Sequence, residues 1–168
     1  ENTGSPHFVE IGHHQPADLT DEMKGRIETI VRALLDQLNY QNGASHIEIK
    51  VDNNDNIYLI EINPRGGGDE ISNQLVKLST GIDYLHQMIA VSLDSFEFVP
   101  QSECVKFAGI YFLCQQTAVN EKFIKESDDK PYFYSKYIAG NESLTNSTSN
   151  KDRDGYMIYC SDHKIFPK

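Results

Sequence analysis

Two short runs of sequence decide the fold of this chain: His46-Ile47-Glu48-Ile49-Lys50-Val51 and Ile57-Tyr58-Leu59-Ile60-Glu61-Ile62-Asn63. In the first run, apolar and polar residues alternate with the period of two that is typical of a β-strand. The residues between the runs, 52–56, are all Asp or Asn, which favour turns. The two runs therefore predict a β-hairpin.

The hydrophobic pattern also predicts the register of this hairpin. The favoured register pairs apolar residues across the strands: Ile47 with Ile62, Ile49 with Ile60, and Val51 with Tyr58. A slip of one residue would place these side chains opposite charged or amide groups and would turn one strand over. We therefore expect the apolar pairs to form one face of the hairpin.

The same register brings acidic side chains together on the other face. Glu48 lies opposite Glu61, and His46 lies opposite Asn63. Directly opposed side chains have Cβ atoms ~5 Å apart, so two carboxylates there repel each other unless a cation lies between them. Two carboxylates and an amide oxygen suit Mg²⁺ or Mn²⁺. Glu48, Glu61 and Asn63 are therefore the candidate metal ligands; taken singly, each glutamate would be read as exposed on a solvated sheet.

A glycine-rich loop follows the second strand. Three consecutive glycines, Gly66 to Gly68, leave backbone N–H groups free to approach an anion, next to the guanidinium of Arg65. The loop is the candidate site for a phosphate or a substrate. Asp69 and Glu70 are interpreted first as charges at the start of the next helix, and only second as ligands.

The rest of the chain predicts an α+β fold, an antiparallel β-sheet with packed helices. The predicted strands are 6–11, 105–113, 132–138 and 156–160, and the predicted helices are 21–38, 71–80 and one capped by Asp83. Residues 141–150 read as a polar loop. We expect residues 1–100 to carry the metal and phosphate site, and residues 101–168 to form a small β-rich C-terminal subdomain.

Composition limits the functions that this chain can have. A length of 168 residues suffices for one core with a small appendage. Fifteen Lys and Arg against 25 Asp and Glu give a net charge of −10, which argues against nucleic acid as a partner. No apolar run approaches the ~20 residues that span a bilayer. The chain's cysteines, Cys104, Cys114 and Cys160, form neither a disulfide framework nor a metal motif, and they fit a reducing, cytoplasmic setting.

The acidic strands and the loop together resemble the C-terminal part of an ATP-grasp ligase. The resemblance rests on the two Glu-bearing strands, separated by 61 − 48 = 13 residues, and on the run Glu61-Ile62-Asn63-Pro64-Arg65. Thr80-Gly81-Ile82-Asp83 and Arg153-Asp154-Gly155-Tyr156 are similar to motifs of the branch that holds L-amino acid ligases and carbamoyl-phosphate-synthase-like carboxylate–amine ligases. The likeness is strongest over residues 7–93.

This resemblance implies an activity and roles for the site residues. Glu48, Glu61 and Asn63 would hold one or two Mg²⁺ ions (or Mn²⁺) at the phosphates of ATP. Arg65 would be catalytic and steady the transferred phosphoryl group, and Gly66 to Gly68 would leave room for substrate. In the family's reaction, a carboxylate takes the γ-phosphate of ATP to form an acyl phosphate. An amine then attacks, which gives an amide or peptide bond, ADP and phosphate.

We expect this chain to be one part of a longer protein. It begins at Glu1 rather than Met, and the lysine-bearing half that covers adenine in the family is not recognised in it. The partners implied are ATP, a small carboxylate, an amine and the missing N-terminal domains, and a homodimer is left open. The chain alone is expected to be inactive. Two alternatives remain: a non-catalytic module for nucleotide-dependent assembly, and an ATP-grasp carboxylase.

Overall fold

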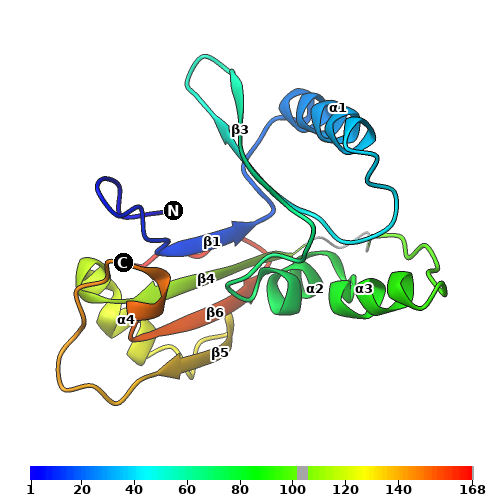
Figure 1. Ribbon diagram of the computed structural model, residues 1–168. Coiled ribbons are helices and arrows are strands. Elements are labelled where there is room, and N and C mark those ends of the chain that lie inside the picture. Colours follow the sequence, from blue (N-terminus) through cyan, green and yellow to red (C-terminus); the bar gives the residue numbers. More distant parts are fainter. Residues whose placement is uncertain (102–105, 168) are drawn as a thin grey trace. The chain divides into compact units, whose positions relative to one another are not determined.

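The computed structural model describes residues 1–101 and 106–167, and it shows two antiparallel sheets with packed helices (Figure 1). The strands are β1 (Gly12–Gln15), β2 (His46–Val51), β3 (Ile57–Asn63), β4 (Phe107–Leu113), β5 (Phe133–Ile138) and β6 (Gly155–Ser161). The helices are α1 (Asp21–Gln37), α2 (Val76–Thr80), α3 (Tyr84–Ser92) and α4 (Glu121–Lys125). The predicted α+β class is confirmed. Val105, the expected start of a strand, and Cys104 lie outside the described residues.

The larger sheet has four strands in the order β1-β4-β6-β5, each antiparallel to its neighbour. Side chains alternate between its two faces, and those of one face form the main core with Ile124 of α4 and Ile165 of the C-terminal segment. The sheet residues of this core are Tyr111, Leu113, Met157 and Tyr159. Burial raises the pKa of the Tyr159 hydroxyl to about 12, so that it stays protonated.

The first strand begins later in the chain than the predicted strand, 6–11. Phe8 has a φ of +48°, in the left-handed region, which interrupts an extended chain. Pairing with β4 starts at Gly12, opposite Tyr111. His13 and His14 therefore lie within β1. The His14 side chain is only 7% exposed, and burial is the main reason that its pKa is lowered.

The chain forms two compact units that alternate along the sequence. The first comprises residues 1–16, 74–82 and 101–168, with the four-stranded sheet and α2, and the second comprises residues 17–73 and 83–100, with α1, the β2–β3 hairpin and α3. Helix α1 starts as predicted: the Thr20 hydroxyl accepts a hydrogen bond of 3.2 Å from Met23 N–H. The sequence also predicts two domains, residues 1–100 and residues 101–168. The two compact units do not test these domain boundaries, so they stay a prediction.

The run from Thr80 to Asp83 joins two helices. Gly81 ends α2 with a φ of +79°, a conformation that glycine adopts without strain. The Asp83 side chain then accepts a hydrogen bond of 3.1 Å from His86 N–H and caps α3, as predicted. Helix α4 was not predicted, because its five residues are too few to show a helical period.

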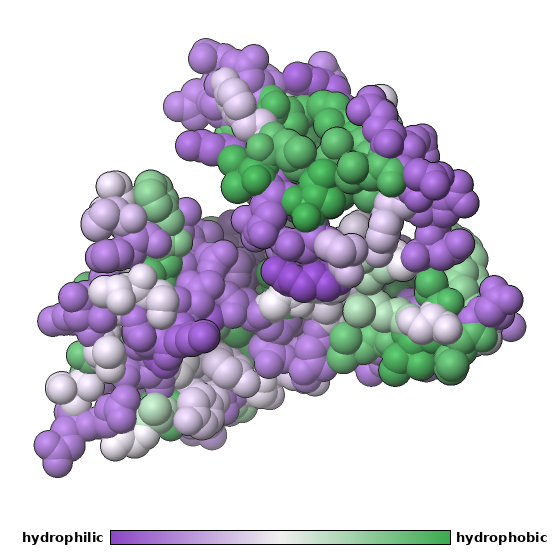
Figure 2. Space-filling model, in the orientation of Figure 1, coloured by the Kyte–Doolittle hydropathy of each residue, from purple (hydrophilic) through white to green (hydrophobic). Residues whose placement is uncertain are grey.

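The second unit exposes many apolar side chains. Figure 2 shows them over the α1 and hairpin region and again over α3. The most exposed of them are Ile60 (61%), Ile89 (60%), Leu93 (70%) and Phe98 (81%). Exposed apolar surface on this scale is typical of a face that another protein segment covers. Among the described helices, none is long and apolar enough to cross a membrane.

Candidate functional site

The β2–β3 hairpin has the predicted register at the end that carries the acids. His46 pairs with Asn63, Ile47 with Ile62, and Glu48 with Glu61. Beyond Glu48 a β-bulge shifts the pairing by one residue, so the predicted pairs Ile49–Ile60 and Val51–Tyr58 are wrong. The observed pairs there are Ile49 with Leu59, Lys50 with Tyr58, and Val51 with Ile57.

The turn explains the bulge. The Asp52 carboxylate accepts hydrogen bonds from the backbone N–H groups of Asn54 (2.8 Å) and Asn56 (2.9 Å), and Asp52 N–H donates to the Asn56 carbonyl (3.0 Å). This closed loop sets Val51 opposite Ile57, one residue out of step with the acids. The bulge takes up the difference.

Glu48 and Glu61 thus meet as direct partners across the ladder, and their side chains project from the same face of the hairpin. The side chain of Glu48 is 40% exposed and Glu61 is also exposed, so both carboxylates are accessible to solvent. Two like charges in this arrangement destabilise the ladder. A cation bound between them would reverse that effect.

His46 is a member of this site that sequence reasoning did not assign. Its Nε2 lies 3.4 Å from Glu48 Oε1, and its side chain is 22% exposed. It shares the face of Glu48 because the two residues are two positions apart on one strand, a spacing that could have identified it. The His46 imidazole therefore belongs to the polar surroundings of the acid pair.

Asn63 places an amide beside the acid pair. Its Nδ2 is buried, with no hydrogen-bond partner among the described residues. The nitrogen and oxygen of an amide are interchangeable in such an assignment, so Asn63 has a polar end that needs a partner. If that end is the amide oxygen, a metal ion could serve as its partner. If it is the NH2 group, a phosphate oxygen could accept its hydrogen bond.

The donor set fits magnesium held together with a nucleotide. Within residues 1–101 and 106–167, no group of three or more His, Cys, Asp or Glu side chains could hold a metal ion. Mg²⁺ does not require such a cage: it keeps several waters and is often bound by one or two carboxylates together with substrate phosphates. Glu48, Glu61 and the Asn63 amide match that requirement.

The glycine-rich loop after β3 is packed closely against its neighbours, whereas the three glycines suggested an open loop for a ligand. A Cβ atom on Gly66 would lie 2.7 Å from Ser72 Oγ, and one on Gly67 would lie 3.0 Å from His46 Nδ1. Only Gly68 of the three has open space around it. Gly66 and Gly67 are therefore needed for close packing inside this unit, and room for a ligand is found at Gly68.

Arg65 lies at the exposed start of this loop. One guanidinium nitrogen, Nη1, donates a hydrogen bond of 2.8 Å to the Gly66 carbonyl. A guanidinium has five N–H donors, so most of them remain available for an anion. After the glycines, Asp69 and Glu70 both have positive φ angles, +50° and +62°, which is rare for side-chain-bearing residues. Glu70 also accepts a hydrogen bond from Asn73 Nδ2 (2.8 Å), in keeping with its predicted place at a helix start.

The Arg153–Tyr156 motif lies in the first unit and has a structural role there. The Arg153 guanidinium carbon lies 3.6 Å from the centroid of the Phe112 ring. The Asp154 carboxylate is buried and accepts hydrogen bonds from Thr145 N–H (2.6 Å), Thr145 Oγ1 (2.8 Å) and Asn141 Nδ2 (2.7 Å). Asp154 therefore holds the polar loop 141–150 against the sheet.

Comparison with known proteins identifies the fold. Residues 1–74 match the family model of the ATP-grasp domain. No curated protein sequence matches the chain. The resemblance to ATP-grasp proteins that the acidic strands indicated is confirmed over this segment.

Solved structures share the fold across nearly the whole chain. L-amino acid ligase from Bacillus licheniformis has a TM-score of 0.70 at 20% identity, over 94% of this chain and 40% of that chain. Phosphoribosylglycinamide synthetase from Anaerococcus prevotii has a TM-score of 0.70 at 18% identity, over 97% and 43%. The biotin carboxylase domain of 2-oxoglutarate carboxylase from Hydrogenobacter thermophilus, solved with MgADP, ADP and bicarbonate, has a TM-score of 0.57 at 15% identity, over 91% and 35%.

These comparisons establish the fold and its extent. The chain spans about 40% of the length of the first two of these solved chains. Over that extent it shares their fold, with antiparallel sheets and packed helices, as the sequence predicted.

Proposed function

We propose that this chain supplies the Mg²⁺ and ATP-phosphate half of an ATP-dependent carboxylate–amine ligase. The observation that carries the proposal is the direct pairing of Glu48 with Glu61 on one face of the hairpin, with Asn63 beside them. Such a ligase would form an acyl phosphate from a carboxylate and ATP, and then an amide or peptide bond. The match of residues 1–74 to the ATP-grasp domain supports the assignment.

Glu48, Glu61 and Asn63 would hold the metal, which would neutralise the negative charge of the ATP phosphates when bound. The protein's own contribution is to fix two carboxylates next to each other on a rigid ladder. Because the whole chain has a net charge of −10, a polyanion can bind only where such local cations gather.

Arg65 would bind the transferred phosphoryl group and the acyl phosphate. Phosphoryl transfer depends mainly on positioning and charge stabilisation, and a guanidinium offers planar, paired donors for phosphate oxygens. The hydrogen bond from Nη1 to the Gly66 carbonyl would restrain the side chain at the mouth of the loop. The space at Gly68 would admit substrate, while Gly66 and Gly67 keep the loop close to His46 and Ser72.

The rest of the active site would come from other parts of the protein. In the proposal, residues 1–100 supply the metal and phosphate half, residues 101–168 form the C-terminal subdomain, and the N-terminal domains cover the exposed apolar side chains of the second unit. The chain by itself would not turn over ATP. ATP-dependent ligation by the isolated 168 residues would refute this part of the proposal.

The metal site can be tested on the chain as it stands. We would titrate it with Mn²⁺ in the presence of ADP and follow paramagnetic broadening of backbone amide signals. The signals of Glu48, Glu61 and Asn63 should broaden first, and Glu48→Gln or Glu61→Gln should abolish the effect. Broadening that spreads evenly over all exposed acids, or that persists in both variants, would contradict the proposal.

The ligase activity requires the longer protein. There, ADP release should depend on a carboxylate and an amine, and a screen of amino acid pairs would find the substrates. Unchanged ATP consumption after Glu48→Gln and Glu61→Gln would favour a non-catalytic module, and bicarbonate-dependent ADP release would favour a carboxylase.

A further inference from the structure

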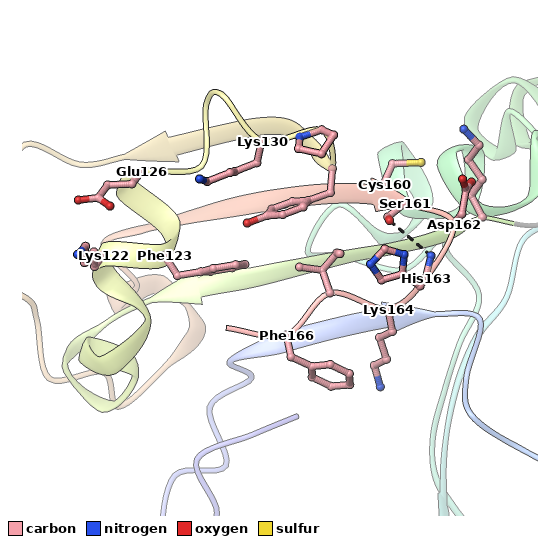
Figure 3. A pocket seen from close by; sticks show the side chains of 14 residues that line it. Lys122, Phe123, Glu126, Lys130, Cys160, Ser161, Asp162, His163, Lys164 and Phe166 are labelled. Atoms are coloured by element: carbon pink, nitrogen blue, oxygen red, sulfur yellow. Dashed lines mark hydrogen bonds between the residues drawn. The ribbon is translucent and has the colours of Figure 1, made fainter. Parts of the chain in front are cut away.

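A pocket of about 920 Å³ lies within the first unit and shares no residue with the proposed metal and phosphate site (Figure 3). It is bordered by α4 and the turn after it, by the end of β6, and by the segment Asp162–Phe166. Figure 3 shows Lys122, Glu126 and Lys130 at one end of the pocket, and Cys160 to His163 at the other.

The pocket has an aromatic wall. The rings of Phe123 and Tyr132 stack with centroids 6.0 Å apart and planes 18° from parallel. Tyr111 supports Phe123 from the core in an edge-on contact, with a centroid distance of 5.8 Å. A flat ring entering the pocket would therefore meet rigid aromatic surface.

The charged side chains of the pocket are unlike those of the rest of the chain. Its lining holds four lysines and two acids, whereas the whole chain has 15 Lys and Arg against 25 Asp and Glu. Lys164 lies over the Phe166 ring, with its ammonium 5.2 Å from the centroid. Within the described residues, Lys122 and Lys130 form no ion pair with a carboxylate. Their ammonium groups are available to an incoming anion.

The end of the pocket with these lysines is held in place before any ligand arrives. Lys130 N–H donates to the Ser127 carbonyl (2.9 Å), and the fully buried Ser127 hydroxyl donates to the Ile124 carbonyl (2.8 Å). Lys136 of β5 donates from Nζ to the Lys125 carbonyl (2.7 Å). These bonds fix the turn after α4 to the sheet, so binding would cost little ordering of the backbone.

We propose that this pocket binds a flat aromatic anion, with its ring against Phe123 and Tyr132 and its phosphate or carboxylate group at Lys122 and Lys130. The aromatic wall and the excess of lysines together carry the inference. It is independent of the proposed ligase function, because no residue is shared between the two sites.

The test measures binding of 1-naphthyl phosphate to the full chain by titration calorimetry, with 1-naphthoate as the carboxylate probe and 1-naphthol as the neutral one. Lys130→Ala and Lys122→Ala should each weaken binding of the bound anion about tenfold, since each removes a charge-assisted hydrogen bond. Glu126→Gln should strengthen it, because a like charge is removed. Lys125→Ala is the matched control: Lys125 is on α4, but its ammonium pairs with Glu121 at 2.6 Å, outside the pocket.

Saturable binding of either anion with this pattern of gains and losses would support the proposal, and the preferred anion would identify the acidic group. Three results would overturn it: no saturable binding of either anion, equal binding of 1-naphthol, or equal weakening by Lys125→Ala. Amide chemical-shift spectra of every variant would establish that the fold is retained.

Discussion

Glu61→Gln should stabilise the metal-free hairpin and at the same time remove its response to metal. The two facing carboxylates repel each other in the absence of a cation, and the amide of Gln keeps the shape of Glu while removing its charge. A residue that is only structural would show the opposite sign, because most substitutions in a ladder destabilise it.

The magnitude follows from the geometry of the pair. Like charges directly opposite on a ladder cost about 0.2–1 kcal/mol, which corresponds to an increase of about 1.4- to 5-fold in amide protection after the substitution. The gain should disappear at about 1 M salt, where the Debye length of ~3 Å is shorter than the ~5 Å between the Cβ atoms. In the wild-type chain, metal–nucleotide at ten times its Kd should add about 1.4 kcal/mol, or about elevenfold protection.

Hydrogen exchange of the β2 and β3 amides measures this local opening directly, with and without Mg²⁺ and ADP. Glu97→Gln, an equal change of charge at an exposed position of the same unit, is the control and should change neither value. Lower protection in metal-free Glu61→Gln, or equal protection of variant and wild type by Mg²⁺ and ADP, would refute the reasoning.

Three further outcomes are expected from the structure. Hydrogen bonds from the Asn56 side chain and backbone are the main reason that the pKa of Asp52 is lowered from 3.8 to about 2. The stabilisation of the turn by Asp52 should therefore be complete above pH 3.8 and lost as the pH falls through about 2. Asp52→Asn should remove this pH dependence, which amide exchange in the hairpin measures. Gly66→Ala should destabilise its unit by about 1–3 kcal/mol in urea unfolding, because its Cβ would press on Ser72, whereas Gly68→Ala should be neutral. Asp154→Ala should lower the free energy of unfolding by about 3 kcal/mol in the same measurement, because it leaves the donors of the 141–150 loop without their buried acceptor. An unchanged urea midpoint would contradict that role.

The hairpin and α1 could be predicted because local pattern and tertiary structure agree there. Alternating residues set the strands, the apolar period set the helix, and the pairing of Glu48 with Glu61 followed from matching apolar side chains across the ladder. The family motif then supplied what local patterns cannot, namely the chemistry expected of those acids.

The parts that were not predicted depend on contacts between distant residues. The bulge arises because the Asp52 turn and the acid pair each impose a register of their own. Gly66 and Gly67 resembled a phosphate loop, but their packing against Ser72 and His46 becomes visible only in three dimensions. Helix α4 is anchored by one buried residue, Ile124, which a search for periodic stripes does not detect.

The β-bulge also interrupts the ladder between the two ends of the hairpin. The distal turn and the paired acids do not share one continuous ladder, because the irregular step after Glu48 lies between them. A residue gained or lost at the tip could then be absorbed at that step without rotating Glu48 or Glu61 off their common face. Evolution could remodel the tip of the hairpin while leaving the paired acids at its base in place.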